Sequence, residues 1–130
     1  MKGRSIRLLI SVAVVGIVLG CVTAHEISNR IRCAGNTIFA EGYNEGLFRD
    51  VAVGWREDDV LARLGAPTSA SVARDGVILE LEGRDYRRHE GDGWSILRYS
   101  APETGDNRMV RDISLSGGKV DYIQSGIFCD

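Results

Sequence analysis

Two histidines are the first candidates for chemistry in this sequence, because an imidazole can serve as a general base or as a metal ligand. They are His25 and His89. His89 is followed by Glu90, which resembles the start of a metalloprotease zinc helix, but no second histidine follows at the required spacing. Gly91 and Gly93 also disfavour a helix there. We therefore expect His89 to be a solvated loop residue.

Loop carboxylates and a glycine-rich turn are the next candidates. Asp85, Glu90 and Asp92 could attract a divalent cation, but their spacing differs from that of an EF-hand loop. The stretch 116–119 (SGGK) lacks the upstream glycine and the following Ser/Thr of a phosphate-binding loop, so it predicts a hairpin turn. We predict a protein without catalytic residues, metal or cofactor. An enzyme that uses the loop carboxylates is the least favoured alternative.

Aromatic and arginine side chains near two predicted loops are candidate partner contacts, because these residue types often anchor protein interfaces. The alternative is that the tryptophans belong to the core and the arginines only solubilise the surface. Arg87 and Arg88 could also meet anionic phospholipid headgroups. The candidates are Trp55, Arg84, Tyr86, Arg87, Arg88 and Trp94.

The composition limits the class of protein that carries these residues. The chain has 130 residues, 44% of them hydrophobic and 26% charged, which is typical of one globular domain. The net charge of −2 argues against a nucleic-acid binder. The first 20 residues hold three basic groups (Lys2, Arg4 and Arg7) and no acidic one, which leaves 13 basic and 18 acidic residues in the remainder. This asymmetry indicates export or membrane anchoring.

The basic start leads into a charge-free run of 17 residues, Leu8 to Ala24, as in a signal peptide or a short membrane anchor. Three fates remain open. The stretch 18–21 (VLGC) resembles a bacterial lipobox, in which cleavage leaves a diacylglycerol on Cys21. The stretch 22–24 (VTA) offers a site for ordinary signal peptidase. Without cleavage, the segment anchors the chain in the inner membrane. All three fates place the later residues outside the cytoplasm, and we assign residues 1–20 as signal peptide or membrane anchor.

The cysteine count supports export. Once Cys21 is lipidated or removed, Cys33 and Cys129 remain as an even pair near the two ends of the exported part. We expect them to form a disulfide in an oxidising compartment, worth roughly 4–5 kcal/mol by chain-entropy reasoning. The alternative is two unrelated thiols, and a nucleophilic role would require a neighbouring base.

A tether followed by two helices is predicted after the leader. Residues 21–43 show no sustained periodicity and predict a tether with room for a short strand at 37–40. Leu47, Phe48 and Val51 have helical spacing. A second helix begins with three acidic residues at 57–59 and is closed by Gly65, with Pro67 beyond it. The folded domain is therefore predicted over residues 44–130.

The rest of the chain predicts strands. In the stretch 94–100, residues 95, 97 and 99 alternate with 94, 96 and 98, which places the two sets on opposite faces. Helices followed by strands predict an α+β fold, with two short helices packed on one face of a three- to four-stranded antiparallel sheet. The predicted strands are 77–81, 94–100, 110–115 and 120–123.

Part of this pattern resembles a known family. The stretch 53–60 (VGWREDDV), followed by 64–67 (LGAP), resembles the signature of the BamE-like, or SmpA/OmlA, family of bacterial envelope lipoproteins. Later elements, the pair Trp94 and Tyr99 and the turn 118–120 (GKV), are similar too. The resemblance covers residues 44–125.

The sequence departs from the family at the start of the second helix. Arg56 stands where the family usually has a capping Thr or Ser, and an arginine cannot accept the amide hydrogen bonds that a hydroxyl accepts. Trp55 replaces a smaller apolar residue. The cap must therefore come from another group or from water.

The resemblance implies a non-catalytic scaffold that contacts envelope proteins, including the outer-membrane β-barrel assembly machinery. Val22 stands where aspartate would signal inner-membrane retention, so a lipid on Cys21 favours the outer membrane, facing the periplasm. We expect an envelope lipoprotein that acts in outer-membrane assembly or maintenance. The same helix–helix–sheet unit resembles the repeat of secreted β-lactamase inhibitor proteins, so the alternative is an inhibitor-like binding module for a periplasmic enzyme, secreted or membrane-anchored.

Overall fold

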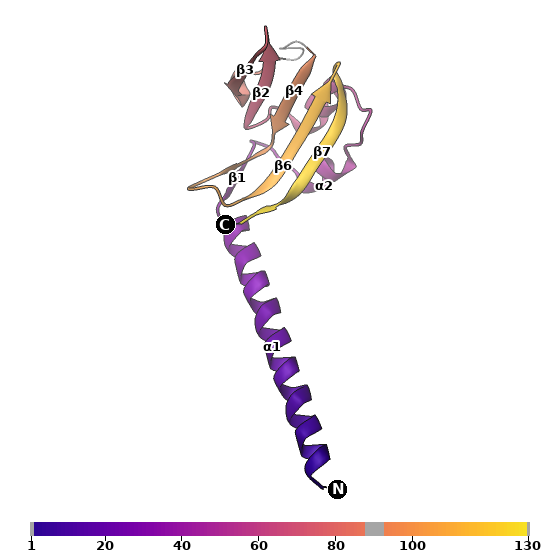
Figure 1. Cartoon of the computed structure of the whole chain (residues 1–130). Helices are drawn as coiled ribbons and strands as arrows, with labels where there is room; N and C mark the ends of the chain where they lie inside the picture. The colour runs from indigo at the N-terminus through magenta and orange to yellow at the C-terminus, as the bar shows by residue number, and fades with distance from the viewer. Residues whose placement is uncertain (1, 88–92, 130) are drawn as a thin grey trace. The chain divides into compact units, whose positions relative to one another are not determined.

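The computed structural model describes residues 2–87 and 93–129, with side chains from residue 14 onward (Figure 1). The chain divides into two units, residues 1–32 and 33–130. The first unit is most of α1, a helix over Lys2–Gly35. The side chains of residues 1–13, which include the basic flank, lie outside the described part. Among the described residues, no helix is both long and apolar enough to cross a membrane.

The predicted tether is helical over much of its length, which corrects the sequence prediction. Residues 21–35 belong to α1, and no glycine or proline interrupts the stretch 22–34. The second unit begins at Cys33, so the predicted domain start at residue 44 is too late. The reason is that β1 (Thr37–Phe39) pairs antiparallel with β5 (Ser100–Pro102) and ties this segment to the sheet-forming part of the chain.

Two helices follow, as predicted. In α2 (Glu45–Asp50), the side-chain oxygen of Asn44 accepts a hydrogen bond from the Leu47 N–H at 3.1 Å and caps the helix. In α3 (Glu57–Leu64), three acidic residues occupy the first turn. Gly65 ends α3 with φ +76°, a backbone conformation that disfavours any side chain.

The start of α3 is capped by the distant hairpin turn. Arg56 makes no side-chain capping bond. Instead, the Glu57 N–H donates to the carbonyl of Gly118 at 3.0 Å. The backbone oxygen of Gly118, in the turn 116–119, thus satisfies one of the N–H groups at the start of α3, and the expectation that a group other than Arg56 caps this helix is met.

The sheet is larger than predicted. It has five antiparallel strands in the order β3-β2-β4-β6-β7, and the β1–β5 pair forms a separate two-stranded sheet. The prediction of three or four strands missed β2 and the pairing of β1 with β5. A short 3₁₀ turn, η1 (Gly83–Asp85), follows β3. The five strands are β2 (Ser69–Arg74), β3 (Val77–Glu82), β4 (Trp94–Arg98), β6 (Arg108–Ser116) and β7 (Lys119–Phe128).

A two-residue turn creates the extra strand. Asp75 and Gly76 have φ values of +51° and +75°, which is the backbone of a tight type I′ hairpin. The turn sets the register in which Arg74 pairs with Val77 and Ser69 with Glu82. The short-side-chain stretch before the turn, SASVAR, is therefore a strand despite its lack of large apolar residues.

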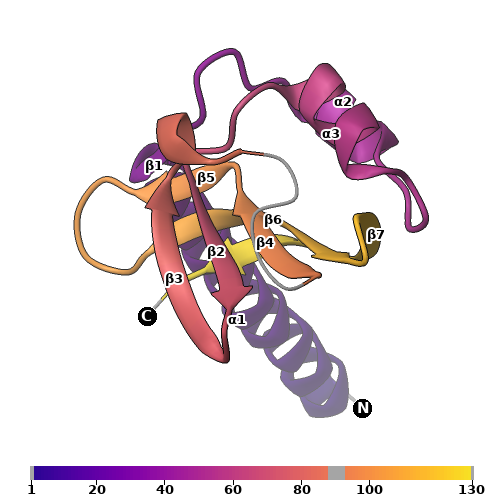
Figure 2. The same ribbon diagram turned by 90° about the horizontal axis from the view of Figure 1, so that it is seen from above.

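Helices α2 and α3 cover one face of the five-stranded sheet (Figure 2). The predicted alternation in β4 is confirmed, since Ser95, Leu97 and Tyr99 are buried while Trp94 and Ile96 are only partly buried. The Tyr99 hydroxyl donates to the carbonyl of Gly65 at 3.1 Å and joins the sheet to the end of α3. The buried core includes Phe48, Val51, Val60, Leu64, Ala70, Val72, Leu97, Tyr99, Ile113, Leu115 and Val120.

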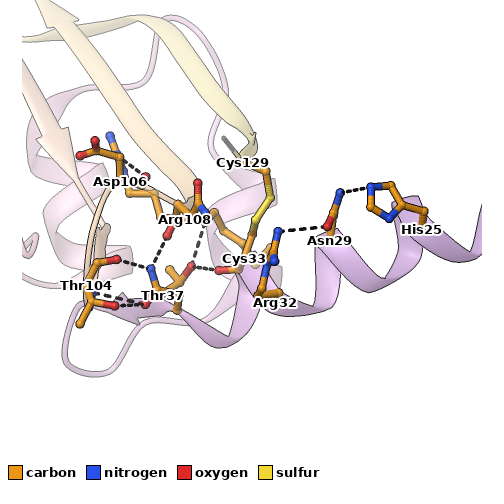
Figure 3. Close-up of a disulfide and its surroundings, with 12 residues drawn as sticks. His25, Asn29, Arg32, Cys33, Thr37, Thr104, Asp106, Arg108 and Cys129 are labelled. Carbon is orange, nitrogen blue, oxygen red and sulfur yellow. Dashed lines mark hydrogen bonds between the residues drawn. A yellow bond between two sulfur atoms is a disulfide. The ribbon is translucent and has the colours of Figure 1, made fainter.

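A disulfide joins the two ends of the second unit (Figure 3). Cys33 and Cys129 pair across 96 residues of sequence, with their Cα atoms 6.2 Å apart. The neighbouring Thr37 hydroxyl donates to the carbonyl of Cys33 at 2.9 Å and accepts from the Met109 N–H at 2.8 Å. The expected pairing of these two cysteines is thus present, and Cys21 is exposed and unbonded.

Gly83 provides a test of the packing around η1. A Cβ atom at this position would overlap the carbonyl oxygen of Pro67. We expect Gly83→Ala to lower the free energy of unfolding by roughly 1–3 kcal/mol, measured by urea titration followed by circular dichroism. Gly126→Ala is the control, because a Cβ there meets nothing within 4 Å. Equal stability of the two variants would contradict this packing.

The disulfide provides a second test. Because it closes a loop of 96 residues, replacing both Cys33 and Cys129 with Ser should lower the free energy of unfolding by about 4–5 kcal/mol. Cys21→Ser is the control, because that thiol is exposed and unbonded. The measurement is urea unfolding of the full chain in detergent. A double variant as stable as the control would show that the bond does not constrain the unfolded chain.

Candidate binding groove

A cavity of about 490 Å³, named the groove, lies between α2 and the β6–β7 hairpin. Apolar side chains from α2 and from the residue just after it form one wall of the groove, and apolar side chains from both strands form the other. The apolar lining residues are Phe48, Val51, Met109, Ile123 and Ile127.

A bidentate ion pair crosses the groove. Arg111 donates from Nε to Glu45 Oε2 at 2.9 Å and from Nη2 to Glu45 Oε1 at 3.0 Å. Its Nη1 donates to the carbonyls of Val110 at 2.7 Å and Gly126 at 3.3 Å. The Arg111 side chain is only 7% exposed. A buried guanidinium is stable here because its hydrogen bonds are largely satisfied.

Glu45 is the centre of the charged cluster. It also accepts from the Tyr43 hydroxyl at 2.6 Å and from Arg49 Nε at 3.1 Å. The hydrogen bonds from Arg111 are the main cause that lowers the pKa of Glu45 to about 2. Burial, together with the Glu45 carboxylate, raises the pKa of the Tyr43 phenol. Glu45 is therefore ionised at neutral pH and holds its donors in place.

Local sequence explains why these groups meet. Asn44 starts α2, which places Glu45 in its first turn. On β6, Arg111 alternates with Asp112 and so shares the helix-covered face with Ile113 and Leu115. The sequence analysis named neither Glu45 nor Arg111. One sequence signal could have identified Arg111: it alternates in step with the apolar residues of a predicted strand and so falls on the buried face.

The predicted contact residues lie at different places. Trp55 is half-buried and lines a second, more open cavity of about 400 Å³ together with Asp59, Ala62 and Arg63. Trp94 lies on the sheet face opposite to the helices. The structure therefore does not bring the two tryptophans into one site.

The predicted arginines are surface residues. Arg84 is exposed and pairs with Glu82 at 2.9 Å. Arg87 is exposed and donates from Nη1 to the carbonyl of Arg84 at 2.9 Å. Arg88 and His89 lie outside the described residues, as do the loop carboxylates Glu90 and Asp92.

Tyr86 does not lie at the surface, which corrects its prediction as a partner contact. It is buried, with 7% exposure, and belongs to the core. Its hydroxyl donates to Glu57 Oε1 at 2.5 Å. Glu57 is itself buried at the start of α3, so its carboxylate needs a donor inside the domain, and the phenol supplies one.

Among the described candidates for metal or nucleophilic chemistry, His25, Cys33 and Cys129 each have another partner. Within the described part of the chain, no group of three or more His, Cys, Asp or Glu residues is placed to hold a metal ion. His25 Nε2 lies 3.2 Å from Asn29 Nδ2, one helical turn away (Figure 3). Cys33 and Cys129 are joined in the disulfide.

Comparison with known proteins adds no relative to this description: no family matches the sequence, and no curated protein and no solved structure matches the chain.

The Glu45–Arg111 pair makes stability depend on pH. The pKa of Glu45 is lowered in the folded state, so its stabilising contribution is present above its ordinary value near 4.5 and is lost as the pH falls toward about 2. We expect Glu45→Gln to lower the free energy of unfolding by about 1–3 kcal/mol at pH 7. Urea titrations between pH 7 and pH 2 should show a steeper acid loss for wild type than for this variant. Parallel curves would contradict the role of the ion pair.

Proposed function

We propose that this protein is a membrane-tethered protein of the bacterial cell envelope that binds another envelope protein and acts without catalysis, in outer-membrane assembly or maintenance. The single observation that carries the proposal is the disulfide between Cys33 and Cys129. Such bonds persist in oxidising compartments and are rare in the cytosol. The basic and apolar start of the sequence supports the same location.

The groove supports binding as the mode of action. Its charged groups are bonded to one another, since the Glu45 carboxylate accepts from Tyr43, Arg49 and Arg111. A carboxylate that is held ionised by three donors is a poor proton donor at neutral pH. The remaining lining is mainly apolar, which suits the burial of a partner's side chains.

The tether is proposed to be a lipid on Cys21, which is exposed and follows the stretch VLG. One acyl chain alone gives only weak membrane binding, whereas a diacylglycerol holds a protein stably. The alternative is a protein released by signal peptidase that inhibits a periplasmic enzyme. The BamE-like resemblance favours the tethered form.

The experiment is site-specific photocrosslinking in bacterial cells that express the full chain. A photoreactive amino acid replaces either Arg49, at the groove, or Val77, which is exposed on the opposite edge strand β3. We expect a discrete crosslinked envelope protein from position 49 and none from position 77. Equal products from both positions, or none from either, would contradict partner binding at the groove.

The same cells test the location and the tether. The thiols of Cys33 and Cys129 should resist alkylation before reduction, because they are oxidised outside the cytoplasm. An alkyne fatty acid should label wild type but not Cys21→Ser, and the wild type should fractionate with the outer membrane. Free thiols in a cytoplasmic product would overturn the envelope assignment. A released and unlabelled product would favour the inhibitor-like alternative.

A further inference from the structure

We infer that the groove and the free edge of β7 together bind an extended peptide segment of the partner, which adds to the sheet as a sixth strand. The segment has apolar residues at alternate positions and one acidic residue. This inference rests on the proposed function and specifies how the partner is recognised.

The direction of the backbone groups on β7 follows from the bonds of β6. The backbone carbonyl of Arg111 accepts from the Tyr99 N–H at 2.8 Å, and the backbone N–H of Arg111 donates to Ser100 Oγ at 2.9 Å. The Arg111 backbone groups therefore point away from β7. In an antiparallel pair, the β7 residue opposite Arg111 then also points its N–H and carbonyl away from β6. That residue is Ser125.

The same alternation extends along the edge. Ile123 is opposite Ile113 and Ile127 is opposite Met109, two residues on either side of the Ser125 pair. Their N–H and carbonyl groups thus point outward with those of Ser125. Among the residues that the structure describes, none bonds to the outward backbone groups of these three positions. An unpaired edge of this kind is a template for strand addition.

The first part of this edge is already hydrogen-bonded to the backbone of another segment. The Gly54 N–H donates to the carbonyl of Val120 at 2.8 Å, and the Val120 N–H donates to the carbonyl of Trp55 at 2.8 Å. These bonds, together with the bridge between Arg56 and Lys119, cover the β7 edge as far as Val120 and not beyond it. A peptide paired with positions 123 to 127 would continue this interaction along the same edge.

The groove sets the side-chain requirement. Ile123, Ser125 and Ile127 line the groove with their side chains. Residues of an added strand that lie beside them point to the same face of the sheet, at every second position. Apolar side chains at those positions would extend over the apolar wall formed with Phe48 and Val51.

Charge sets the second requirement. The groove holds two guanidinium groups, Arg49 and Arg111, and one carboxylate, Glu45, so it carries a net positive charge. Arg111 is buried against Glu45, whereas the Arg49 side chain is 75% exposed. A carboxylate on the bound segment is complementary to this charge and has Arg49 as its accessible partner.

The test measures peptide binding to the full chain in detergent by fluorescence anisotropy. The probe is a dye-labelled seven-residue peptide that alternates valine with threonine and ends in an aspartate and a capping amide. Two further probes carry either N-methylated amides, which cannot pair as a strand, or asparagine in place of the aspartate. We expect N-methylation to weaken binding at least about tenfold and the asparagine probe to bind roughly threefold to tenfold more weakly.

Two proline variants test the edge from the side of the protein. Ser125→Pro removes an outward N–H only, so the sheet should fold while peptide binding falls at least about tenfold. The matched control is Ile78→Pro on β3. The two-residue turn makes Arg74 and Val77 a hydrogen-bonded pair, so the N–H of Ile78 also points outward, but away from the groove. Arg49→Gln should weaken the aspartate probe and leave the asparagine probe unchanged.

The outcomes separate the inference from the proposed function. Equal binding of the N-methylated probe, or unchanged binding to Ser125→Pro, would overturn strand addition. If Ser125→Pro fails to fold by circular dichroism, the N-methylated probe and Arg49→Gln decide the matter. Crosslinks from position 49 without peptide binding would leave the proposed function standing and remove this inference. If the chain binds the peptide but lies in the cytoplasm of cells, the proposed envelope function falls and the strand-addition inference stands.

Discussion

Three backbone hydrogen bonds between the segment 54–57 and the β6–β7 hairpin hold the helical layer on the sheet. The Gly54 N–H donates to the carbonyl of Val120, and the Val120 N–H donates to the carbonyl of Trp55. The Glu57 N–H donates to the carbonyl of Gly118. These bonds fix where α3 begins, because the Gly118 carbonyl takes the place of a capping side chain. They also cover the first part of the β7 edge. The position of both helices, and hence the wall of the groove, depends on this short stretch of pairing.

The Glu45–Arg111 pair adds specificity to that arrangement. An apolar pair of similar size could pack in the same space at no loss of stability, since two charges must lose their water to meet here. The ion pair instead requires one register of β6 under α2, because a slip by one residue would turn Arg111 to the other sheet face. The carbonyls of Val110 and Gly126 complete its hydrogen bonds, so the pair ties α2 to both strands of the hairpin.

The sequence predicted the elements whose signals are local. The acidic first turn and Gly65 marked α3, and the alternation from 94 to 99 marked the buried face of β4. It missed β2, because SASVAR has no run of large apolar residues and only the Asp75-Gly76 turn marks it. The sequence analysis also missed that residues 21–35 are helical. It searched for an amphipathic pattern, and such a search overlooks a helix without a clear apolar face.

The site was harder to predict for a physical reason. Glu45 and Arg111 are 66 residues apart, and each is ordinary in its own context. Residue type selected Trp55 as a partner contact, and the structure places it at a cavity. The same criterion also selected Tyr86, whose hydroxyl is needed by a buried carboxylate. Residue type alone does not predict which side chains contact each other in the fold. The same side chain lies at the surface or in the core depending on the register of its strand or helix.

The Cys33–Cys129 disulfide also decides how the domain bears mechanical load. A pull through α1 enters the second unit at residue 33. Without the disulfide, the hydrogen bonds of Asn36 to the loop 104–107 and the three-residue pairing of β1 with β5 would be the first contacts to resist it. The covalent bond passes this force directly to Cys129, just beyond the end of β7, a strand that pairs with β6 from residue 119 to residue 128. In a tethered domain, this bond would therefore relieve the β1–β5 pairing of part of the load.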